Sequence, residues 1–280
     1  MNSILLTRSE EQLKHHYTVE KELADRLRNA TKKERAKLYP QVYNEIFHRV
    51  PDHSALARQF SVAEEKHRLK SQMGFLKSYL SSKQLTFIEV GAGDCHLCFE
   101  IAELVKKVYA IEVSETISDN KFVPNNFELL ITDGHTIPLP NQVADVIYSN
   151  QVMEHLHPDD AFQQLAEIHR ILKPKGVYLC VTPSRLNGPH DISQYFTETP
   201  TGFHLKEYTI SELTRIFKAN GFSSVKVHVG GNGYYLPALP TLPFEILEQL
   251  LWKMPRKIRL AISKTFLFRI LLNVRVAGYK

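Results

Sequence analysis

The sequence predicts a doubly wound α/β fold built on a mostly parallel sheet. Between residues 85 and 229, short runs rich in β-branched and aromatic residues alternate with stretches of helical periodicity. The first of these runs, residues 85–90, ends in a glycine turn, Gly91-Ala92-Gly93. Strands that alternate with helices indicate a parallel sheet with crossovers, and a glycine turn after the first strand is typical of doubly wound folds.

The elements of this core follow from the spacing of apolar residues and from the residues that begin and end helices. Asp159 or Asp160, for example, begins a helix that Pro174 and Gly176 end. We expect helices at residues 97–105, 159–172 and 211–220. We expect strands at residues 85–90, 108–113, 127–132, 143–149, 176–182, 224–229 and 273–280.

The chain divides into two parts near residue 80. Residues 1–80 are expected to form a helical N-terminal extension, because Glu, Lys, Arg, Leu and Ala predominate and no glycine precedes Gly74. Residues 81–280 then form the main domain. Within it, residues 236–270 begin with three closely spaced prolines, Pro237, Pro240 and Pro243, and continue with two amphipathic basic stretches, so we expect a helical insertion before the last strand.

The composition excludes several classes of protein. The chain is 43% hydrophobic and 23% charged, as in ordinary globular proteins. A net charge of +5 is too small to indicate nucleic-acid binding, and we expect no nucleic-acid partner. The cysteine content, three residues, argues against a disulfide scaffold and fits a reducing, cytoplasmic location. No apolar run reaches the length of about 18 residues that a membrane-spanning helix needs.

The residues around the glycine turn favour a nucleoside ligand. Glu89 precedes the turn, where a carboxylate can accept from an ammonium group, and Glu112 ends the second strand, where it can bind both ribose hydroxyls. Asp133 and Gly134 end the third strand, where an acceptor can meet an exocyclic amine. A dinucleotide is the alternative, but His96 stands where the dinucleotide motif G-x-G-x-x-G has its last glycine.

Five segments of the core follow one another in a fixed order: Glu-Val-Gly-Ala-Gly-Asp at 89–94, Ile-Glu-Val at 111–113, Asp-Gly-His-Thr-Ile-Pro-Leu-Pro at 133–140, Ala-Asp-Val-Ile-Tyr-Ser-Asn-Gln-Val-Met-Glu-His-Leu at 144–156 and Ile-Leu-Lys-Pro-Lys-Gly at 171–176. Together they resemble the class I S-adenosylmethionine-dependent methyltransferases, most closely the branch called type 11 or type 23. The resemblance covers residues 84–230. The sequence departs from the family at Cys95, where the family usually has a third glycine.

The resemblance implies a Rossmann-like sheet whose last strand is antiparallel, with S-adenosylmethionine as cofactor. It also implies a role for each matching residue. Gly91, Ala92 and Gly93 would cradle the methionine part with Glu89 and Asp94 nearby, Glu112 would bind the ribose, Val113 would pack on the adenine, Asp133 and Gly134 would read the adenine edge, and Asn150 would approach the methionine or the acceptor.

Transfer to an oxygen acceptor can need a general base near neutral pH, which makes histidines at the ligand edge candidates. His155 follows the fourth strand and His190 lies in the loop after the fifth, although each could equally bond to its own turn or loop. Cys95 and Cys98 have the C-x-x-C spacing, but they lack the second pair of ligands that a zinc site needs. We therefore predict no metal site.

The helical insertion has two interpretations. If the last strand is antiparallel, both ends of residues 236–270 lie at the ligand edge, and the insertion would overhang the active site as a lid or acceptor platform. Residues 244–270 also mix Phe, Leu and Ile with Lys and Arg, which is typical of a helix on an anionic membrane surface. The same apolar residues could equally pack on the core.

The charge is unevenly distributed along the chain. Residues 1–80 carry 15 basic and 10 acidic side chains, residues 81–235 carry 12 and 18, and residues 236–280 carry 8 and 2. The cofactor-binding core is therefore acidic, which suits a cationic cofactor, and lies between two basic flanks. The flanks indicate an anionic acceptor or surface, such as phosphorylated saccharides or lipid headgroups.

These observations predict an S-adenosylmethionine-dependent methyltransferase. We expect it to be an O-methyltransferase whose acceptor is a hydroxyl of a small molecule, a saccharide or a lipid-linked saccharide. We expect it in the cytoplasm, including the inner face of a membrane. Two alternatives stay open: a non-catalytic methyltransferase-like binding module, and a dinucleotide-dependent oxidoreductase.

Overall fold

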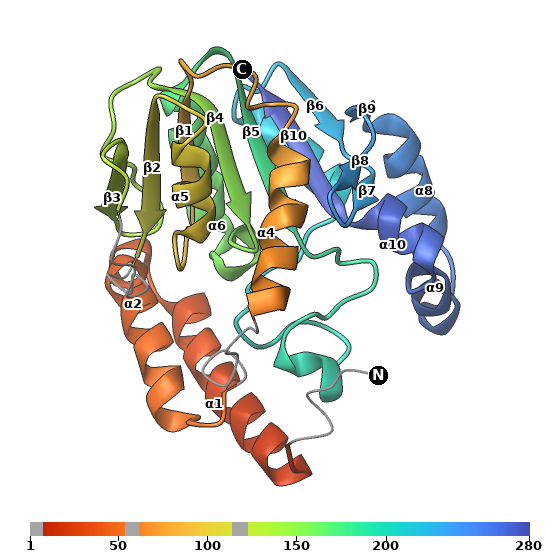
Figure 1. Ribbon diagram of the computed structural model, residues 1–280. Helices are drawn as coiled ribbons and strands as arrows, with labels where there is room; N and C mark the ends of the chain where they lie inside the picture. The colour runs from red at the N-terminus through yellow and green to blue at the C-terminus, as the bar shows by residue number, and fades with distance from the viewer. Residues whose placement is uncertain (1–7, 54–61, 114–122) are drawn as a thin grey trace.

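An eight-stranded sheet runs through the computed structural model, which describes residues 8–53, 62–113 and 123–280 (Figure 1). The strand order is β3-β2-β1-β4-β5-β10-β6-β9. The strands are β1 (Thr86–Val90), β2 (Lys107–Glu112), β3 (Phe127–Ile131), β4 (Ala144–Asn150), β5 (Leu172–Thr182), β6 (Ser224–Val227), β9 (Leu239–Pro240) and β10 (Val274–Tyr279), beside a small separate pair, β7 (Gly230–Gly231) and β8 (Tyr234–Tyr235).

The pairing of the strands confirms the predicted fold class. β1 lies parallel to both β2 and β4, and β4 lies parallel to β5. β10 is the last strand of the chain and runs antiparallel between β5 and β6, as the resemblance implied. β5 begins at Leu172, four residues before the predicted start, because Leu172 still pairs with Ala144 across an irregularity in the register.

Helices cover both faces of the sheet. One buried cluster packs α4 and α5 on one face, and a second packs α6 and α7 on the other face together with α1, α2 and α8. The helices are α1 (Glu10–Asn29), α2 (Lys32–Arg49), α4 (Val62–Leu76), α5 (His96–Ala102), α6 (Pro158–Ile171), α7 (Ile210–Ala219), α8 (Leu242–Trp252), α9 (Arg256–Ser263) and α10 (Phe266–Leu272), with two short 3₁₀ turns, η2 (Met153–His155) and η3 (Ile192–Tyr195).

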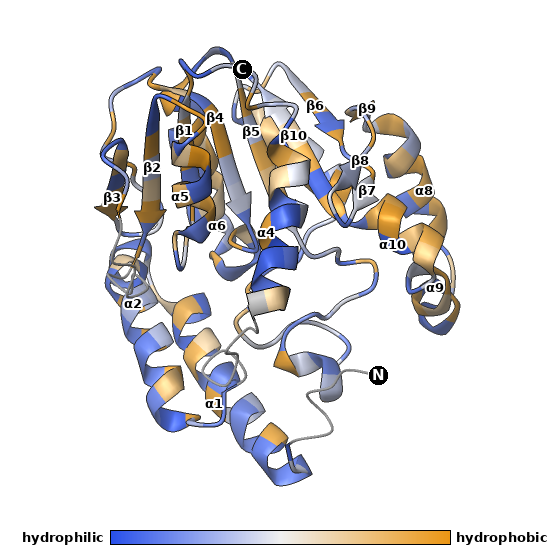
Figure 2. Cartoon of the chain, viewed as in Figure 1, coloured by the Kyte–Doolittle hydropathy of each residue, from blue (hydrophilic) through white to orange (hydrophobic). Residues whose placement is uncertain are grey.

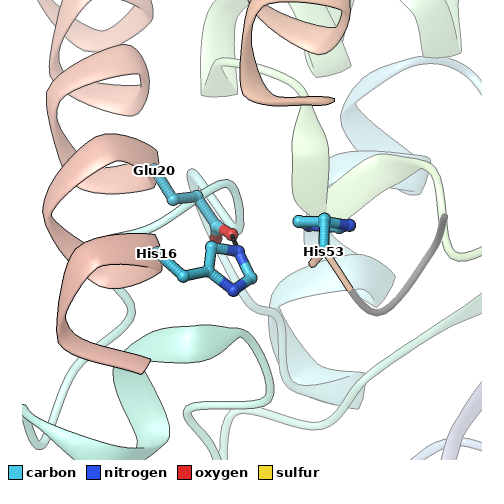
Figure 3. Close-up of side chains that lie close together, drawn as sticks. All are labelled: His16, Glu20 and His53. Carbon is cyan, nitrogen blue, oxygen red and sulfur yellow. Dashed lines mark hydrogen bonds and ion pairs between the residues drawn. The ribbon is translucent and has the colours of Figure 1, made fainter. Parts of the chain in front are cut away.

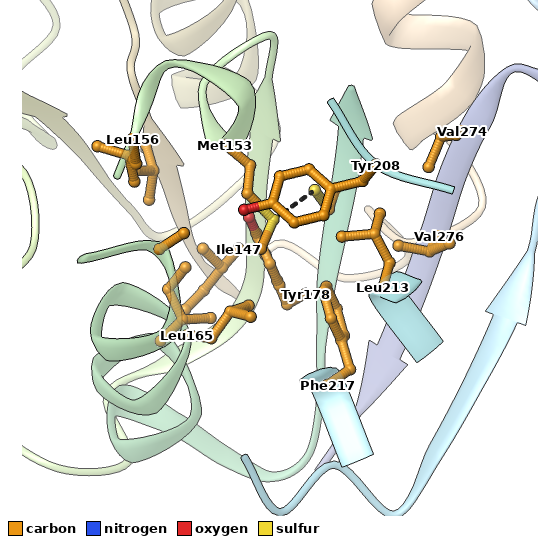
Figure 4. Close-up of a cluster of buried hydrophobic side chains, with 14 of the residues drawn as sticks. Ile147, Met153, Leu156, Leu165, Tyr178, Tyr208, Leu213, Phe217, Val274 and Val276 are labelled. Carbon is orange, nitrogen blue, oxygen red and sulfur yellow. Dashed lines mark hydrogen bonds between the residues drawn. The ribbon is translucent and has the colours of Figure 1, made fainter. Parts of the chain in front are cut away.

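The core explains why the central strands form where they do. All five side chains of β1 are buried, as expected of a strand covered on both faces. Figure 4 shows aliphatic side chains packed around the rings of Tyr178, Tyr208 and Phe217 in the larger cluster. Tyr178 stacks on Phe217 at 5.4 Å between ring centroids. In Figure 2 the strands are largely hydrophobic, with hydrophilic segments in β2 and β6, whereas α1 and α2 are largely hydrophilic. The sheet is thus the buried frame of the fold, and α1 and α2 are amphipathic helices packed against it.

A buried ion pair joins the first two helices to this frame. Arg35 of α2 forms two hydrogen bonds to the Asp160 carboxylate of α6, at 2.6 and 2.8 Å. The Tyr39 hydroxyl donates to the same carboxylate at 2.8 Å and accepts from the His157 backbone N–H at 2.9 Å. α2 is therefore fixed against the residues that follow β4.

The insertion between β6 and β10 lies at the opposite end of the sheet from β3 (Figure 1). It contains three helices rather than the two expected, because Thr265 begins a further short helix, α10. Glu248 of α8 is buried and accepts hydrogen bonds from the backbone N–H groups of Ile210 and Ser211, at the start of α7. In the described part of the chain, no helix is long and apolar enough to cross a membrane.

Candidate active site

A cavity of about 430 Å³ opens at the carboxyl ends of β1, β2 and β4. This is the edge where doubly wound folds bind ligands, and the volume is in the usual range for a small-molecule site. Three parts of the chain form its wall: the glycine turn with the ends of β1 to β4, the segment after β4, and α2. The lining residues are Tyr39, Tyr43, Asn44, Phe47, Val90, Gly91, Gly93, Ile111, Glu112, Val113, Thr132, Gly134, Gln151, Val152, His155, Leu156 and Gln164.

The glycine turn and Glu112 form one hydrogen-bonded unit. The Gly93 N–H donates to one Glu112 carboxylate oxygen at 2.5 Å, and the Val113 N–H donates to the other at 3.1 Å. Gly93 has φ +55°, and a Cβ added there would meet nothing within 4 Å. At Gly91, with φ +72°, an added Cβ would collide with Val152. The turn is therefore open on the side of Gly93, where a ligand can approach the backbone.

A smaller, polar cavity of about 100 Å³ lies on the other side of this turn and shares Gly91 and Gly93 with the first. It is lined by four residues predicted to lie near the methionine: Glu89, Ala92, Asp94 and Asn150. α4 adds side chains that sequence reasoning missed, Arg68 and Gln72, and Arg68 donates to Asp94 at 2.5 Å. The two cavities therefore meet at the glycine turn.

Glu89 is a buried carboxyl in this second cavity. Burial raises its pKa to about 8, and the neighbouring carboxylates of Asp94 and Glu112 act in the same direction. The Cys98 thiol donates to Glu89 at 3.1 Å and opposes that rise. The site therefore holds a carboxyl group that would ionise readily beside a cation.

Cys95, the departure from the family pattern, has the backbone conformation that favours glycine. Its φ is +58°, in the left-handed region, at the N-terminus of α5. The side chain is nonetheless fully buried among apolar residues, and all three cysteines of the chain, Cys95, Cys98 and Cys180, are free. The turn thus keeps its shape with a cysteine in place of the third glycine.

Asp133 does not line either cavity. Its carboxylate accepts hydrogen bonds from the backbone N–H groups of His135 and Thr136, at 3.0 and 2.7 Å, and from the Thr136 hydroxyl. It stabilises its own turn, and its neighbours Thr132 and Gly134 line the cavity instead. The predicted contact of Asp133 with an adenine edge stays a prediction that this geometry does not support.

The two candidate catalytic histidines occupy different places. His155 lines the large cavity, and its Nδ1 lies 3.1 Å from the Phe203 carbonyl oxygen. Burial, together with nearby His204, lowers the pKa of His155 to about 4, so the ring is neutral at pH 7. His190 does not line the cavity, and its Nε2 contacts Ser184 O and Asn187 Oδ1 within its own loop, at 3.0 and 2.8 Å. Of the two, the structure brings only His155 to the site.

The wall formed by α2 was missed in the sequence analysis. Tyr39, Tyr43 and Phe47 recur every four residues and therefore lie on one face of the helix. That aromatic stripe was the available signal, but core packing gives the same pattern. By contrast, no residue of 236–270, all of which the structure describes, lines this cavity. The expectation that the insertion overhangs the cofactor cavity is wrong, because its helices pack beyond β6 and β10.

Comparison with known proteins identifies the family of this domain and the cofactor that the family uses. Residues 88–180 match the family model of a methyltransferase domain, type 11. The chain carries a class I S-adenosylmethionine-dependent methyltransferase domain of the type 11 branch. A probable S-adenosylmethionine-dependent methyltransferase of Mycolicibacterium smegmatis is 29% identical over 137 residues, which are 48% of this chain and 51% of that protein.

Two further proteins are similar to this methyltransferase domain. An uncharacterised methyltransferase of a Geobacillus species is 28% identical over 159 residues, covering 53% of this chain and 74% of that protein. The crystal structure of an S-adenosylmethionine-dependent methyltransferase from Archaeoglobus fulgidus has a TM-score of 0.51 at 17% identity, and the match covers 78% of this chain and 98% of that one. The chain spans about half the length of several curated relatives that it matches.

The residues of the methyltransferase domain fit S-adenosylmethionine. The open side of the turn at Gly93 leaves room for a ligand against the backbone. Glu112 offers carboxylate oxygens at the end of β2, where a ribose diol can be bound. Glu89 and Asp94 place acidic groups in the polar cavity, which suits a cofactor that carries positive charge. The shape of the turn and the acidic groups around it therefore suit S-adenosylmethionine, the cofactor of the family.

Proposed function

We propose that the chain transfers the methyl group of S-adenosylmethionine to a hydroxyl group of a small molecule or saccharide. The observation that carries the proposal is the large cavity, because one continuous surface joins the cofactor-binding turn to His155 and to the aromatic wall of α2. A relative in Yersinia pestis, 27% identical over 140 residues, is a malonyl-[acyl-carrier protein] O-methyltransferase, which supports an oxygen acceptor.

The chemistry of the reaction divides between cofactor and protein. S-adenosylmethionine supplies an electrophilic methyl group, so the protein has to orient the reactants and exclude water. Glu112 and the glycine turn bind the nucleoside side, and Glu89 and Asp94 offer negative charge to the other side. Tyr43 and Phe47 of α2 give the cavity an apolar wall.

Binding and turnover test the proposal separately. Calorimetry should show that S-adenosylmethionine binds and NAD does not, which separates a methyltransferase from an oxidoreductase. Mass spectrometry should then detect S-adenosylhomocysteine formed with hydroxylated acceptors, including phosphorylated and lipid-linked saccharides. Tight cofactor binding without turnover on any acceptor or cell extract would favour the non-catalytic module instead.

We also propose that the insertion contacts an anionic membrane surface. Its helices expose large apolar side chains, among them Ile246, Leu250, Ile258, Phe266 and Leu267. In α9, α10 and the turns beside them, Lys253, Arg256, Lys257, Arg259, Lys264 and Arg269 accompany the apolar residues, as in helices that lie on anionic lipid. Such a contact would bring the domain to a lipid-linked acceptor.

A further inference from the structure

Three polar side chains converge beside the large cavity. One carboxylate oxygen of Glu154, one ring nitrogen of His155 and one ring nitrogen of His204 lie within 4.8 Å of one another. Glu154 and His155 belong to the 3₁₀ turn η2 after β4, and His204 comes from the loop between η3 and α7. Two imidazoles and one carboxylate form a donor set that divalent transition metals take, with positions left open for other ligands.

Hydrogen bonds leave the other ring nitrogen of each histidine available as a ligand. His155 Nδ1 lies 3.1 Å from the Phe203 carbonyl oxygen, which can only accept, so Nδ1 carries the hydrogen. His204 Nδ1 lies 2.8 Å from a Glu207 carboxylate oxygen and donates to it in the same way. When the rings are neutral, both Nε2 atoms present a lone pair. Carbonyl and carboxylate partners of this kind typically orient the histidine ligands of a metal.

One carboxylate oxygen of Glu154 accepts a hydrogen bond, and the other accepts none from the described residues. The Thr182 hydroxyl donates to Oε2 at 2.9 Å, whereas Oε1 is buried and accepts no hydrogen bond from the described residues. The side chain is 0% exposed. A buried oxygen without a partner costs free energy, and a bound cation would remove that cost.

The surroundings of these three side chains carry an excess of buried carboxyl groups. Glu207 and Asp191 are also buried, and Glu207 Oε2 has no hydrogen-bond partner among the described residues. Both carboxylates hold His204, Glu207 by accepting from its Nδ1 and Asp191 by accepting from its backbone N–H. Carboxyl groups gathered in this way favour a bound cation.

A second histidine and carboxylate cluster nearby lacks these properties. His16 and Glu20 of α1 face His53 across a short gap (Figure 3). Here both carboxylate oxygens of Glu20 are used, one by His16 Nε2 at 2.8 Å and the other by the Phe203 backbone N–H at 2.9 Å. His16 Nδ1 lies 2.9 Å from an Arg8 nitrogen. This cluster links α1 to the 191–204 loop, and it serves as a matched control.

We propose that Glu154, His155 and His204 bind a divalent first-row transition-metal ion such as Zn²⁺, with Thr182 and Glu207 orienting two of the ligands. Metal–ligand bonds of about 2.0–2.2 Å require the three side chains to close around the ion. The site was not expected from the sequence, because Glu154 and His155 lie about 50 residues before His204 and match no local ligand spacing.

The consequence for catalysis rests on the proposed function. His155 lines the large cavity, so an ion held by its Nε2 would lie at the cavity wall with coordination positions left for an acceptor hydroxyl. The ion would position and polarise that hydroxyl, and His155 would then act as a ligand rather than as a general base. Metal binding itself requires neither cofactor nor acceptor.

The test is a metal titration of the full chain after treatment with a chelator. Wild type should bind one Zn²⁺ or Co²⁺ per chain by calorimetry and visible absorption, and the bound metal should raise the melting temperature. Glu154→Gln and His204→Gln should each weaken binding by at least about 100-fold, and Glu207→Gln by about 10-fold. Glu20→Gln, in the matched control cluster, should leave the affinity unchanged.

Several results would overturn the proposal: no stoichiometric binding, binding that survives in both Glu154→Gln and His204→Gln, or binding that only Glu20→Gln abolishes. Circular dichroism of each variant shows whether it folds. X-ray absorption of zinc-loaded wild type needs no variant and should show two imidazoles and oxygen ligands; sulfur ligands or fewer than two imidazoles would also refute the site. Because no cofactor is present, these outcomes are independent of methyl transfer.

Discussion

Glu112 and Asp133 both end a strand at the ligand edge, yet only Glu112 lines the cavity. Glu112→Gln removes a charged hydrogen-bond acceptor from the site, and such bonds contribute about 1.5–3 kcal/mol. We therefore expect the dissociation constant of S-adenosylmethionine to rise by about 10- to 100-fold, measured by calorimetry.

Asp133→Asn is the matched control for this experiment. Its carboxylate bonds to the backbone of its own turn, so the affinity should change by less than about threefold. If the two variants lose the same affinity, or if Asp133→Asn loses more, then the cofactor does not lie against Glu112 as proposed.

Glu89 should couple cofactor binding to pH. Its pKa of about 8 keeps the carboxyl protonated at pH 7, and a cationic ligand favours the carboxylate. The charged and titratable groups around it include Cys98, Asp94, Glu112, Arg68, Cys95 and Tyr148. Affinity should therefore rise with pH from about 6.5 to 8 and then level off, and binding at pH 7 should release a proton.

Calorimetry at pH 7 in buffers of different ionisation enthalpy measures that proton release. Glu89→Gln should bind without it and should lose the part of the pH dependence that wild type shows below pH 8. Equal proton release in wild type and in Glu89→Gln would show that another group, not Glu89, takes part in the linkage.

The roles of single residues could be predicted only in part, for a physical reason. The position of a residue at a strand end follows from the alternation of strands and helices, so Glu112 and Asp133 were both placed at the correct edge. The direction of a side chain depends on competing local hydrogen bonds, and Asp133 has such partners in Thr136 and His135. His190 is a second example, because its ring nitrogen already has hydrogen-bond partners within its own loop.

At the scale of elements, the join between α2 and α6 should be a major source of stability. Asp160 is completely buried with Arg35 and Tyr39, and removing one partner of a buried pair leaves the other charge uncompensated. Asp160→Asn should lower the free energy of unfolding by about 3–5 kcal/mol in urea denaturation. Glu22→Gln, which removes the solvent-exposed partner of Arg49, should lower it far less, because water and salt screen that pair. Similar small losses in both variants would contradict this assignment.

The sheet could be predicted from the sequence, but the arrangement of the helices around it could not. Each buried strand has a local signature, and the chain order of strands and helices restricts how they pair. The place of α2 depends on contacts more than 100 residues apart, such as Arg35 with Asp160. The position predicted for the insertion was wrong for a related reason. Both its ends lie at the predicted edge of the sheet, but Glu248 holds α8 against α7, away from the cavity.

At the scale of the whole molecule, charge and exposed apolar side chains are distributed unevenly, and the two regions that differ in them suit two different functions. The acidic core, residues 81–235, contains most of the residues that line the two cavities, and α2 and α4 supply the rest. The basic C-terminal part lies at the far end of the sheet, where α8 to α10 pack beyond β6 (Figure 1). These helices line neither cavity, so a contact with a membrane would use a surface separate from both.

This arrangement predicts salt-sensitive binding to anionic vesicles through the insertion. Phe266 and Leu267 are 79% and 61% exposed, and lysines and arginines flank them. Each basic residue near such a surface contributes about 1 kcal/mol, which salt screens. The protein should co-sediment with phosphatidylglycerol-containing vesicles at low salt and much less at high salt or with purely zwitterionic vesicles. A Phe266→Ser, Leu267→Ser variant should lose this binding, whereas Tyr234→Ser, at a residue 80% exposed outside these helices, should keep it. If the double substitution leaves vesicle binding unchanged, or if the protein does not bind vesicles at low salt, these helices are not a membrane-binding surface.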